Sequence, residues 1–459
     1  MTARALRIAI LLAVVSVAAW LAVRSRPAAS EGRVVRQPLF AMGEIPVERV
    51  DLLMLERPGA PTLEFVRSAD GWSQAVPFVH PADAAAIRMV IDAFASLEST
   101  RAVDPASLDP EARVALGLDP ARARVTVTWP GGSRTVVLGR RTVAGRAWAR
   151  VDGRADAASV DAGLHAIALE DDPRQWRSSR LHDAASADVA RLELRYGPAP
   201  GQQLVIARSG GAWRSEAPFS TRIDAEAVRG YLDALLRADA DAFVADEPKD
   251  LAAFGLASPE RAVRLRASGD AVPDVGLIEV GVPVAEGAQE RFGRIDGRPV
   301  VVQLGPRALA ALFPPPAFFI DPRGCAAVPA DVRRIEFVPP EGSAALPWAA
   351  ERSLDAWTLR VGSAADAAVA VPADRERVRR LLAQLCEARA PAIAFQQAPK
   401  ELVLGTFRLV GAGDLPIAEV RIAREQAGQW ALDGLDGVLR VHPPGFDVAT
   451  DPAAYAGNR

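Results

Sequence analysis

The chain has 459 residues, of which 50% are hydrophobic and 24% are charged, and its net charge is -3. This length is sufficient for roughly two to four domains with cores of their own. The composition is typical of a folded chain, and the small negative charge argues against a broad surface for nucleic acid. We therefore expect a multidomain protein with no nucleic-acid partner.

Residues 6–23 form a hydrophobic stretch whose uncharged run extends from Ile8 to Val23, with arginines on both sides. A run of this length lies between the core of a signal peptide and a short membrane span. The small residues at 28–30 would suit cleavage of a signal, whereas Trp20 and the arginines after the run favour an uncleaved anchor. The arginine count alone would keep the body of the chain inside, but large domains cross membranes largely regardless of charge. We predict a single-pass inner-membrane anchor, with the bulk of the chain in a bacterial periplasm.

A short amphipathic helix pattern occurs three times in the remaining sequence. Each copy begins at an aspartate, and apolar residues follow at positions +4, +7, +8 and +11, which is one face of a helix. An aspartate in this place caps a helix by accepting hydrogen bonds from the amides of the first turn. The three patterns start at Asp83, Asp224 and Asp374 and place Ile87, Val90, Ile91 and Phe94, then Val228, Tyr231, Leu232 and Leu235, then Val378, Leu381, Leu382 and Leu385 in the core.

Strand-like patterns precede each predicted helix, and the three copies start about 142 residues apart, which indicates one unit used three times. Alternating apolar residues predict half-buried strands that form a meander. A turn and a tryptophan end the meander in each copy, at Trp72, Trp213 and Trp357. Their recurrence favours a core plug beneath the helix over an aromatic ligand platform.

A glycine landmark follows the helix in the first two copies, at Gly117 and Gly255, where a left-handed turn is expected. Further alternating runs then predict more strands. The third copy retains the landmark only at residues 403–405 and is therefore interpreted as a divergent terminal copy.

We predict an α+β fold with an N-terminal membrane-anchor helix and three tandem units. Each unit has antiparallel strands packed on one amphipathic helix, and the third unit is degenerate. The predicted divisions are residues 1–37 for the anchor and tether, 38–183 for repeat 1, 184–325 for repeat 2 and 326–459 for repeat 3.

The landmarks of the first repeat together resemble the bacterial domain-of-unknown-function 4340 family, and the likeness covers most of residues 46–323. Repeat 2 carries it with Ala-Ser-Pro in place of Asp-Pro, and repeat 3 only in part. The resemblance implies an anchored envelope protein that assists a gliding-type ABC transporter, through its permease or an auxiliary subunit, and it implies no catalytic residues. It is carried by Trp72, Pro81-Ala82-Asp83, Gly117-Leu118-Asp119-Pro120 and Arg150-Val151-Asp152-Gly153.

No motif predicts a catalytic residue, a cofactor or a metal site. The four histidines are scattered, and no phosphate loop or nucleophile motif is present in the sequence. Cys325 and Cys386 are too few for a zinc site; buried thiols are the default, and a single bridge outside the cytoplasm stays open. The residues singled out are structural: Trp72, Asp83, Gly117, Trp213, Asp224, Gly255, Trp357 and Asp374.

These patterns favour a non-catalytic, membrane-anchored envelope adaptor. Its expected partners are the inner membrane, contacted through residues 6–23, and an ABC-type transport complex. The alternative is a protein that binds a glycan or lipid in clefts between repeats. A hydrolase is the third interpretation.

Overall fold

The computed structural model describes residues 36–457, apart from residues 70, 104–107, 143–144, 171, 183–188, 268–273, 296, 355, 363–369 and 425–427. The anchor predicted at residues 6–23 lies outside these described residues. Within the described residues, no helix combines the length and the apolar character needed to cross a membrane. The chain divides into two compact units, Met1–Ser178 and Ser179–Arg459, and each is described by itself.

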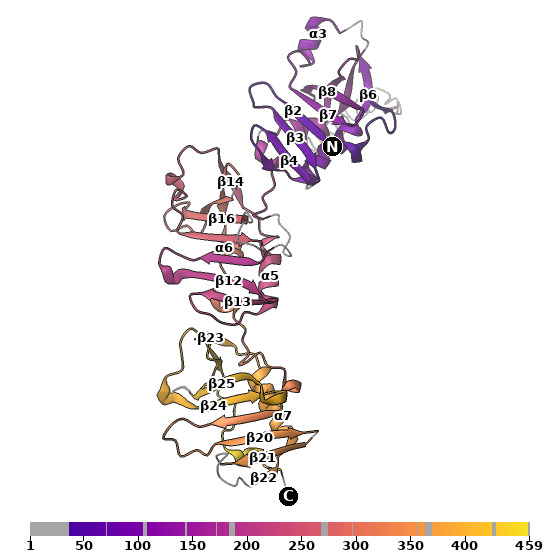
Figure 1. Cartoon of the computed structure of the whole chain (residues 1–459). Helices are drawn as coiled ribbons and strands as arrows, with labels where there is room; N and C mark the ends of the chain where they lie inside the picture. Colours follow the sequence, from indigo (N-terminus) through magenta and orange to yellow (C-terminus); the bar gives the residue numbers. More distant parts are fainter. Residues whose placement is uncertain are drawn as a thin grey trace, which may run out of the picture. The chain divides into compact units, whose positions relative to one another are not determined.

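The first unit is built on one ten-stranded antiparallel sheet with the strand order β1-β6-β10-β9-β8-β7-β2-β3-β4-β5 (Figure 1). Its helices are α2 (Ala84–Ala95), α3 (Pro110–Ala115) and α4 (Gly163–Ala168). Its strands are β1 (Gln37–Pro38), β2 (Leu52–Glu56), β3 (Leu63–Ser68), β4 (Gly71–Val76), β5 (His80–Pro81), β6 (Glu98–Val103), β7 (Ala123–Trp129), β8 (Gly132–Arg141), β9 (Arg146–Val151) and β10 (Ala157–Asp161).

Alternation along the strands directs one set of side chains into the core and the other set away from it. In β2, Leu53 and Leu55 are buried beside the apolar face of α2, while Glu56 faces the other side of the sheet. A smaller apolar cluster covers part of that other side, where Leu118 packs on Val137. The outer face of the sheet is therefore partly covered and partly open.

The second unit contains two further antiparallel sheets, one for repeat 2 and one for repeat 3. The sheet of repeat 2 consists of β11 (Arg191–Arg195), β12 (Gln203–Ser209), β13 (Ala212–Ala217), β14 (Ala242–Asp246), β15 (Arg261–Arg266), β16 (Asp274–Pro283), β17 (Arg291–Ile295) and β18 (Val300–Leu304), with helices α5 (Ala225–Leu235) and α6 (Pro306–Leu312). The sheet of repeat 3 consists of β19 (Arg334–Val338), β20 (Trp348–Ser353), β21 (Ala356–Val361), β22 (Ala370–Pro372), β23 (Ala392–Ala394), β24 (Val403–Val410), β25 (Pro416–Arg424), β26 (Trp430–Asp433) and β27 (Leu439–His442), with helix α7 (Arg375–Cys386).

All three sheets share one strand order. The series β4-β3-β2-β7-β8-β9-β10-β6 matches β13-β12-β11-β15-β16-β17-β18-β14 and β21-β20-β19-β24-β25-β26-β27-β23. The third repeat thus keeps the topology of the first two although its sequence diverges, and it has no counterpart of α4 and α6 between β27 and its last described residue. Alternation of apolar residues sets the strands, and it is retained where the glycine landmark is not.

The prediction of an α+β fold is confirmed in part. The sheets are antiparallel, and α2, α5 and α7 each bury the four apolar residues that the helical spacing indicates. Strands nevertheless account for most of the regular structure, and three strands that follow the main helices, β6, β14 and β23, were not expected. Of these, β14 and β23 are edge strands, and β6 lies beside the edge strand β1.

Each repeat is closed by a short 3-10 turn that ends in an aromatic residue beside the start of the main helix. The amide of the capping aspartate donates a hydrogen bond to the carbonyl of this aromatic residue. The three pairs are Asp83 with Trp176 at 2.9 Å, Asp224 with Phe319 at 2.8 Å and Asp374 with Tyr455 at 2.8 Å.

Candidate functional site

The three aspartates act on the first turn of α2, α5 and α7. The Oδ1 atoms of Asp83, Asp224 and Asp374 accept hydrogen bonds from the amides two residues later, at 2.8, 3.0 and 2.9 Å. These bonds satisfy amides that a helix leaves without an internal partner. The aspartates therefore have a structural role. Because each lies in a different repeat, they do not form an acidic cluster.

The recurrent tryptophans are not equivalent. Trp357 is buried in the core of repeat 3, and Trp72 packs half-buried against the core of repeat 1. Trp213 is half-buried in repeat 2. Trp72 and Trp357 therefore pack with the cores of their own repeats.

The two landmark glycines stand where a side chain would clash. Gly117 and Gly255 have φ values of 68° and 67°, in the left-handed region. A Cβ atom would lie 2.9 Å from the amide nitrogen of Arg140 at the first position and 2.8 Å from that of Val282 at the second. Both glycines hold the turn after the helix against the following strand.

The histidines are buried and lie apart. Burial lowers the pKa of His165 and brings that of His442 to about 4. Among the described residues, no group of three His, Cys, Asp or Glu side chains has the arrangement of a metal site.

Repeats 2 and 3 meet at a junction built on a buried arginine. Arg440 is fully buried, and its two terminal nitrogens each donate a 2.7 Å hydrogen bond to Asp436. The hydroxyl of Thr221, in repeat 2, donates to the same carboxylate at 2.6 Å. Burial alone would raise the pKa of Asp436, but the hydrogen bonds and charge of Arg440 lower it. The carboxylate therefore stays ionised and joins the two repeats.

A second carboxylate, that of Asp321, lies in the connector between the two repeats. Its side chain is buried and accepts hydrogen bonds from Arg323 at 2.9 and 3.0 Å, and its carbonyl accepts a 3.0 Å hydrogen bond from Nε of Arg440. Burial works to raise its pKa, but Arg323 and Arg222 lower it. Two ionised carboxylates are thus held by arginines from both repeats.

Asp224 has a further role at this junction. Its Oδ2 atom accepts a 2.6 Å hydrogen bond from Arg389 of repeat 3, while Oδ1 caps α5. Asp224 therefore acts both as a helix cap and as an ion-pair partner across the junction. Beside this contact, the rings of Phe219 and Phe395 stack with centroids 4.9 Å apart.

A hollow of about 350 Å³ opens at the junction. Thr221 and Arg222 from repeat 2 and Asp436 and Glu419 from repeat 3 are among the residues that line it. Three of its charged groups already have ion-pair partners: Arg222 with Asp321, Glu419 with Arg408 and Asp436 with Arg440.

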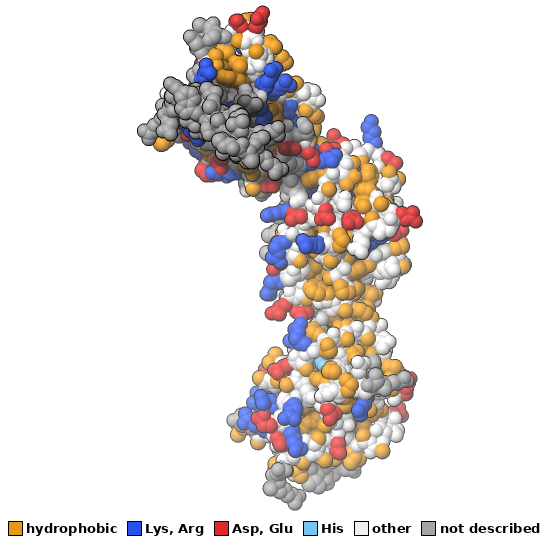
Figure 2. All heavy atoms as spheres, turned by 180° about the vertical axis from the view of Figure 1, so that it is seen from behind, with side chains coloured by type: hydrophobic (Ala, Val, Ile, Leu, Met, Phe, Trp, Pro, Cys, Tyr) orange, Lys and Arg blue, Asp and Glu red, His pale blue; other side chains and the backbone are white. Residues whose placement is uncertain are grey.

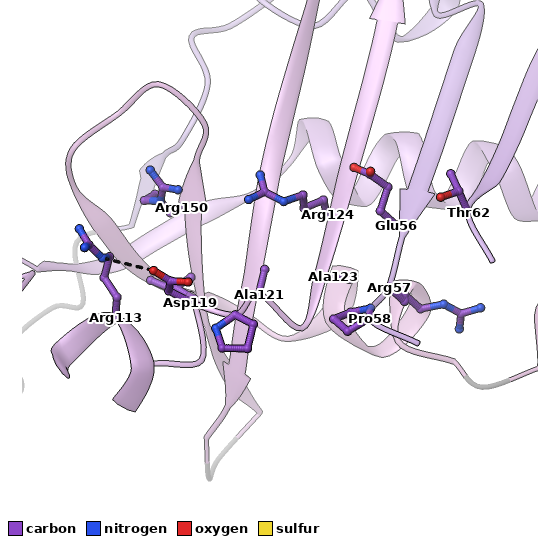
Figure 3. Close-up of a pocket in the computed structure, with 12 residues that line it drawn as sticks. Glu56, Arg57, Pro58, Thr62, Arg113, Asp119, Ala121, Ala123, Arg124 and Arg150 are labelled. Atoms are coloured by element: carbon purple, nitrogen blue, oxygen red, sulfur yellow. Dashed lines mark ion pairs between the residues drawn. The ribbon is translucent and has the colours of Figure 1, made fainter. Parts of the chain in front are cut away.

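A larger hollow, of about 620 Å³, lies on the outer face of the sheet in the first unit (Figure 3). Four arginines and two carboxylates line it, so positive charge is in excess. The guanidinium group of Arg124 is directed along the sheet toward Arg150. Arg113 approaches Asp119 only to 4.0 Å, and the Nε atoms of Arg113 and Arg150 are buried without a hydrogen-bond acceptor among the described residues.

The sheet register shows why the first repeat alone has this excess. Val137 pairs with both Arg124 and Arg150 across the strands. In repeat 2 the matching residue is Glu279, which binds Arg294 at 2.6 Å. In repeat 3 the pair is reversed, with Arg421 at 3.4 Å from Asp433. The first repeat therefore retains the arginine but not the carboxylate that neutralises it in repeat 2.

Neither the junction nor this hollow was expected from the sequence. Arginines are so abundant in this chain that no single one stands out. On the face shown in Figure 2, basic and acidic side chains are interspersed over the described surface, which agrees with a chain of nearly balanced charge.

Together these features define a class of protein, a tandem array of antiparallel sheets that share one topology and each pack on a capped helix. The family model for a domain of unknown function (DUF4340) matches residues 72–223 and 213–401, and the chain belongs to this family. No curated protein matches the sequence.

Replacing Asp224 with Ala should destabilise the second unit by about 1.5–2 kcal/mol, because it removes a helix cap worth about 1 kcal/mol and a half-exposed ion pair worth about 0.5–1 kcal/mol. Asp374→Ala, at the same place in repeat 3, should cost about 1 kcal/mol. Urea unfolding of these variants, with Arg389→Ala and the double variant, gives the coupling energy. No coupling between positions 224 and 389 would contradict the junction contact.

Acid should weaken the junction only below the pH at which exposed carboxylates take up protons, because the pKa values of its two buried carboxylates are lowered. Because the folded-state pKa values of Asp321 and Asp436 are lowered, their contribution is complete above the unfolded value of about 4 and is lost as the pH falls through the folded values. Thermal unfolding between neutral and acidic pH should show a shallower acid dependence for Asp436→Asn. The exposed control Glu286→Gln should follow the wild type, and identical profiles for all three chains would refute this assignment.

Proposed function

We propose that this protein is a non-catalytic accessory protein of the bacterial envelope, anchored in the inner membrane, which acts as an adaptor for an ABC-type transport complex. The observation that supports the proposal best is the buried junction of Arg440, Asp436 and Thr221. A buried ion pair contributes little net stability over a hydrophobic contact, but it tolerates few alternative geometries. An adaptor needs this property, because it must present two surfaces at a fixed spacing.

The distribution of shared residues supports the same proposal. All three repeats share a helix cap and a closing aromatic residue, and the first two also share a glycine turn. The fold itself requires these features. The fold places no such requirement on exposed faces and loops, where a partner can be recognised. The repeats thus act as scaffolds that carry different surfaces.

A tagged full-length chain, purified from gently solubilised membranes, should retain a specific inner-membrane complex. The variant Arg440→Met/Asp436→Leu, which removes both buried charges together, should still fold but retain less of the complex, because this ion pair no longer holds repeats 2 and 3. A chain lacking residues 1–37 separates the contribution of the anchor from that of the repeats. Absence of any membrane partner, together with turnover of an ester, glycan or peptide by the purified protein, would contradict the adaptor function.

The second candidate function is binding of an anionic group from an envelope glycan or lipid. The arginine-lined hollow of the first repeat supports it, since guanidinium groups bind carboxylate and phosphate through paired hydrogen bonds. This hollow lies within one repeat, so the candidate no longer depends on clefts between repeats.

Calorimetry with inorganic phosphate and with glucuronate, at low ionic strength, should detect saturable binding that Arg150→Ala weakens at least about tenfold, which corresponds to 1.4 kcal/mol. Arg294→Ala is the matched control, because Arg294 occupies the same register position in repeat 2 but is neutralised by Glu279. Equal weakening by both variants, or no saturable binding, would exclude this function for the hollow.

A further inference from the structure

The two cysteines, which are far apart in the sequence, meet at the start of repeat 3. Cys325 lies in the connector that leads out of repeat 2, and Cys386 ends α7. Their Sγ atoms are 3.0 Å apart, and both side chains are buried. A disulfide requires about 2.0 Å between the sulfurs, so a small rotation of either side chain would close the bond.

The backbone around the pair holds this approach in place. The amide of Cys325 donates a 3.0 Å hydrogen bond to the carbonyl of Leu385, the residue before Cys386. Gly324 makes the approach feasible, because a Cβ atom at this position would lie 2.6 Å from the same carbonyl oxygen. The two sulfurs are therefore brought together by main-chain geometry and not only by side-chain conformation.

We propose that Cys325 and Cys386 form a structural disulfide that fastens the connector to the end of α7 when the chain folds in an oxidising compartment. The oxidising compartment rests on the proposed function, which places the chain in the bacterial envelope. The geometry of the cysteine pair does not depend on that proposal. The bond would close a loop across most of the first half of repeat 3, because the two cysteines are 61 positions apart in the sequence. Closing a loop of this length restricts the unfolded chain more than the folded one.

The chemistry is an exchange with a disulfide of an envelope thiol oxidoreductase or with oxidised glutathione. The thiolate of Cys325 attacks one sulfur of the donor disulfide, and the other donor sulfur leaves as a thiolate. Cys386 then loses its proton and attacks the Cys325 sulfur, which expels the second donor sulfur. The chain loses two electrons and two protons, and the donor disulfide is reduced to two thiols.

The surroundings assign the two roles in this exchange. The hydrogen bond between the two sulfurs lowers the pKa of Cys325 against the opposing effect of burial, and the charges of Arg222 and Arg323 act in the same direction. The same hydrogen bond, together with burial, raises the pKa of Cys386. Cys325 is therefore the more readily ionised thiol, and since both side chains are buried, the bond forms during folding and is then shielded from reductants.

The first experiment uses the purified full-length chain in a glutathione buffer, followed by unfolding, alkylation without reductant and mass measurement. The wild type should take up no alkyl group, whereas Cys325→Ser and Cys386→Ser should each take up one. After reduction in denaturant and refolding in the presence of reductant, the wild type should melt at a temperature lower by roughly 5–15 °C. The double variant Cys325→Ala/Cys386→Ala should melt at the same temperature with and without reductant.

Two alkylated thiols in the oxidised buffer, on a chain that melts cooperatively, would overturn the disulfide. The second experiment quenches intact cells with acid and counts the alkylated thiols of the full-length chain. A closed bond in the cells supports the proposal and its oxidising compartment together. Free thiols in the cells, with a bond that closes in the glutathione buffer, would instead overturn the periplasmic location in the proposed function.

Discussion

One backbone hydrogen bond, from the amide of the capping aspartate to the closing aromatic residue, determines how each repeat is completed. It brings the last residues of a repeat to the first turn of its main helix, although most of the repeat lies between them. The same aspartate caps this turn with its side chain, so one residue organises both the start of the helix and the end of the repeat. The next connector then begins at a fixed point on the fold.

In the second unit, this arrangement explains why the ion pairs and the two cysteines lie close together. From the closing turn of repeat 2 the connector runs to the end of α7, where the amide of Ala390 donates a hydrogen bond to the carbonyl of Pro322. Asp321, Arg323 and Cys325 therefore all lie within a few residues of one another, against repeat 3. The ion pairs and the thiol pair are two ways of holding the same short connector. This dense contact agrees with repeats 2 and 3 forming one compact unit.

The arginine-lined hollow has a different origin, because it depends on a substitution within a repeated pattern. Val137 stands where the matching residue of repeat 2 is an acid, and the neighbouring arginine then has no carboxylate across the strand. Such a difference is visible only once the strands are aligned by their hydrogen bonds. It distinguishes one repeat from its sisters without any change in the fold.

The helices were predictable because four apolar residues in helical spacing after an aspartate form a strong local pattern. The edge strand β14 was not predictable, since none of its residues is fully buried and its sequence lacks the alternation of a half-buried strand. The junction could not be predicted either, because Thr221 and Asp436 are separated by 215 positions and no local pattern joins them. The family was recognised from turns and caps, which specify a fold but no ligand.

The account depends most on the claim that repeats 2 and 3 behave as one rigid body around their ion-paired connector. Native-state hydrogen exchange tests it directly, because the amides of Asp224 and Asp374 report on the closure of the two repeats separately. If the claim is right, both amides exchange through the same opening, with one free energy and one dependence on denaturant. Exchange of the Asp374 amide through a separate opening of lower free energy, with repeat 2 still closed, would contradict it.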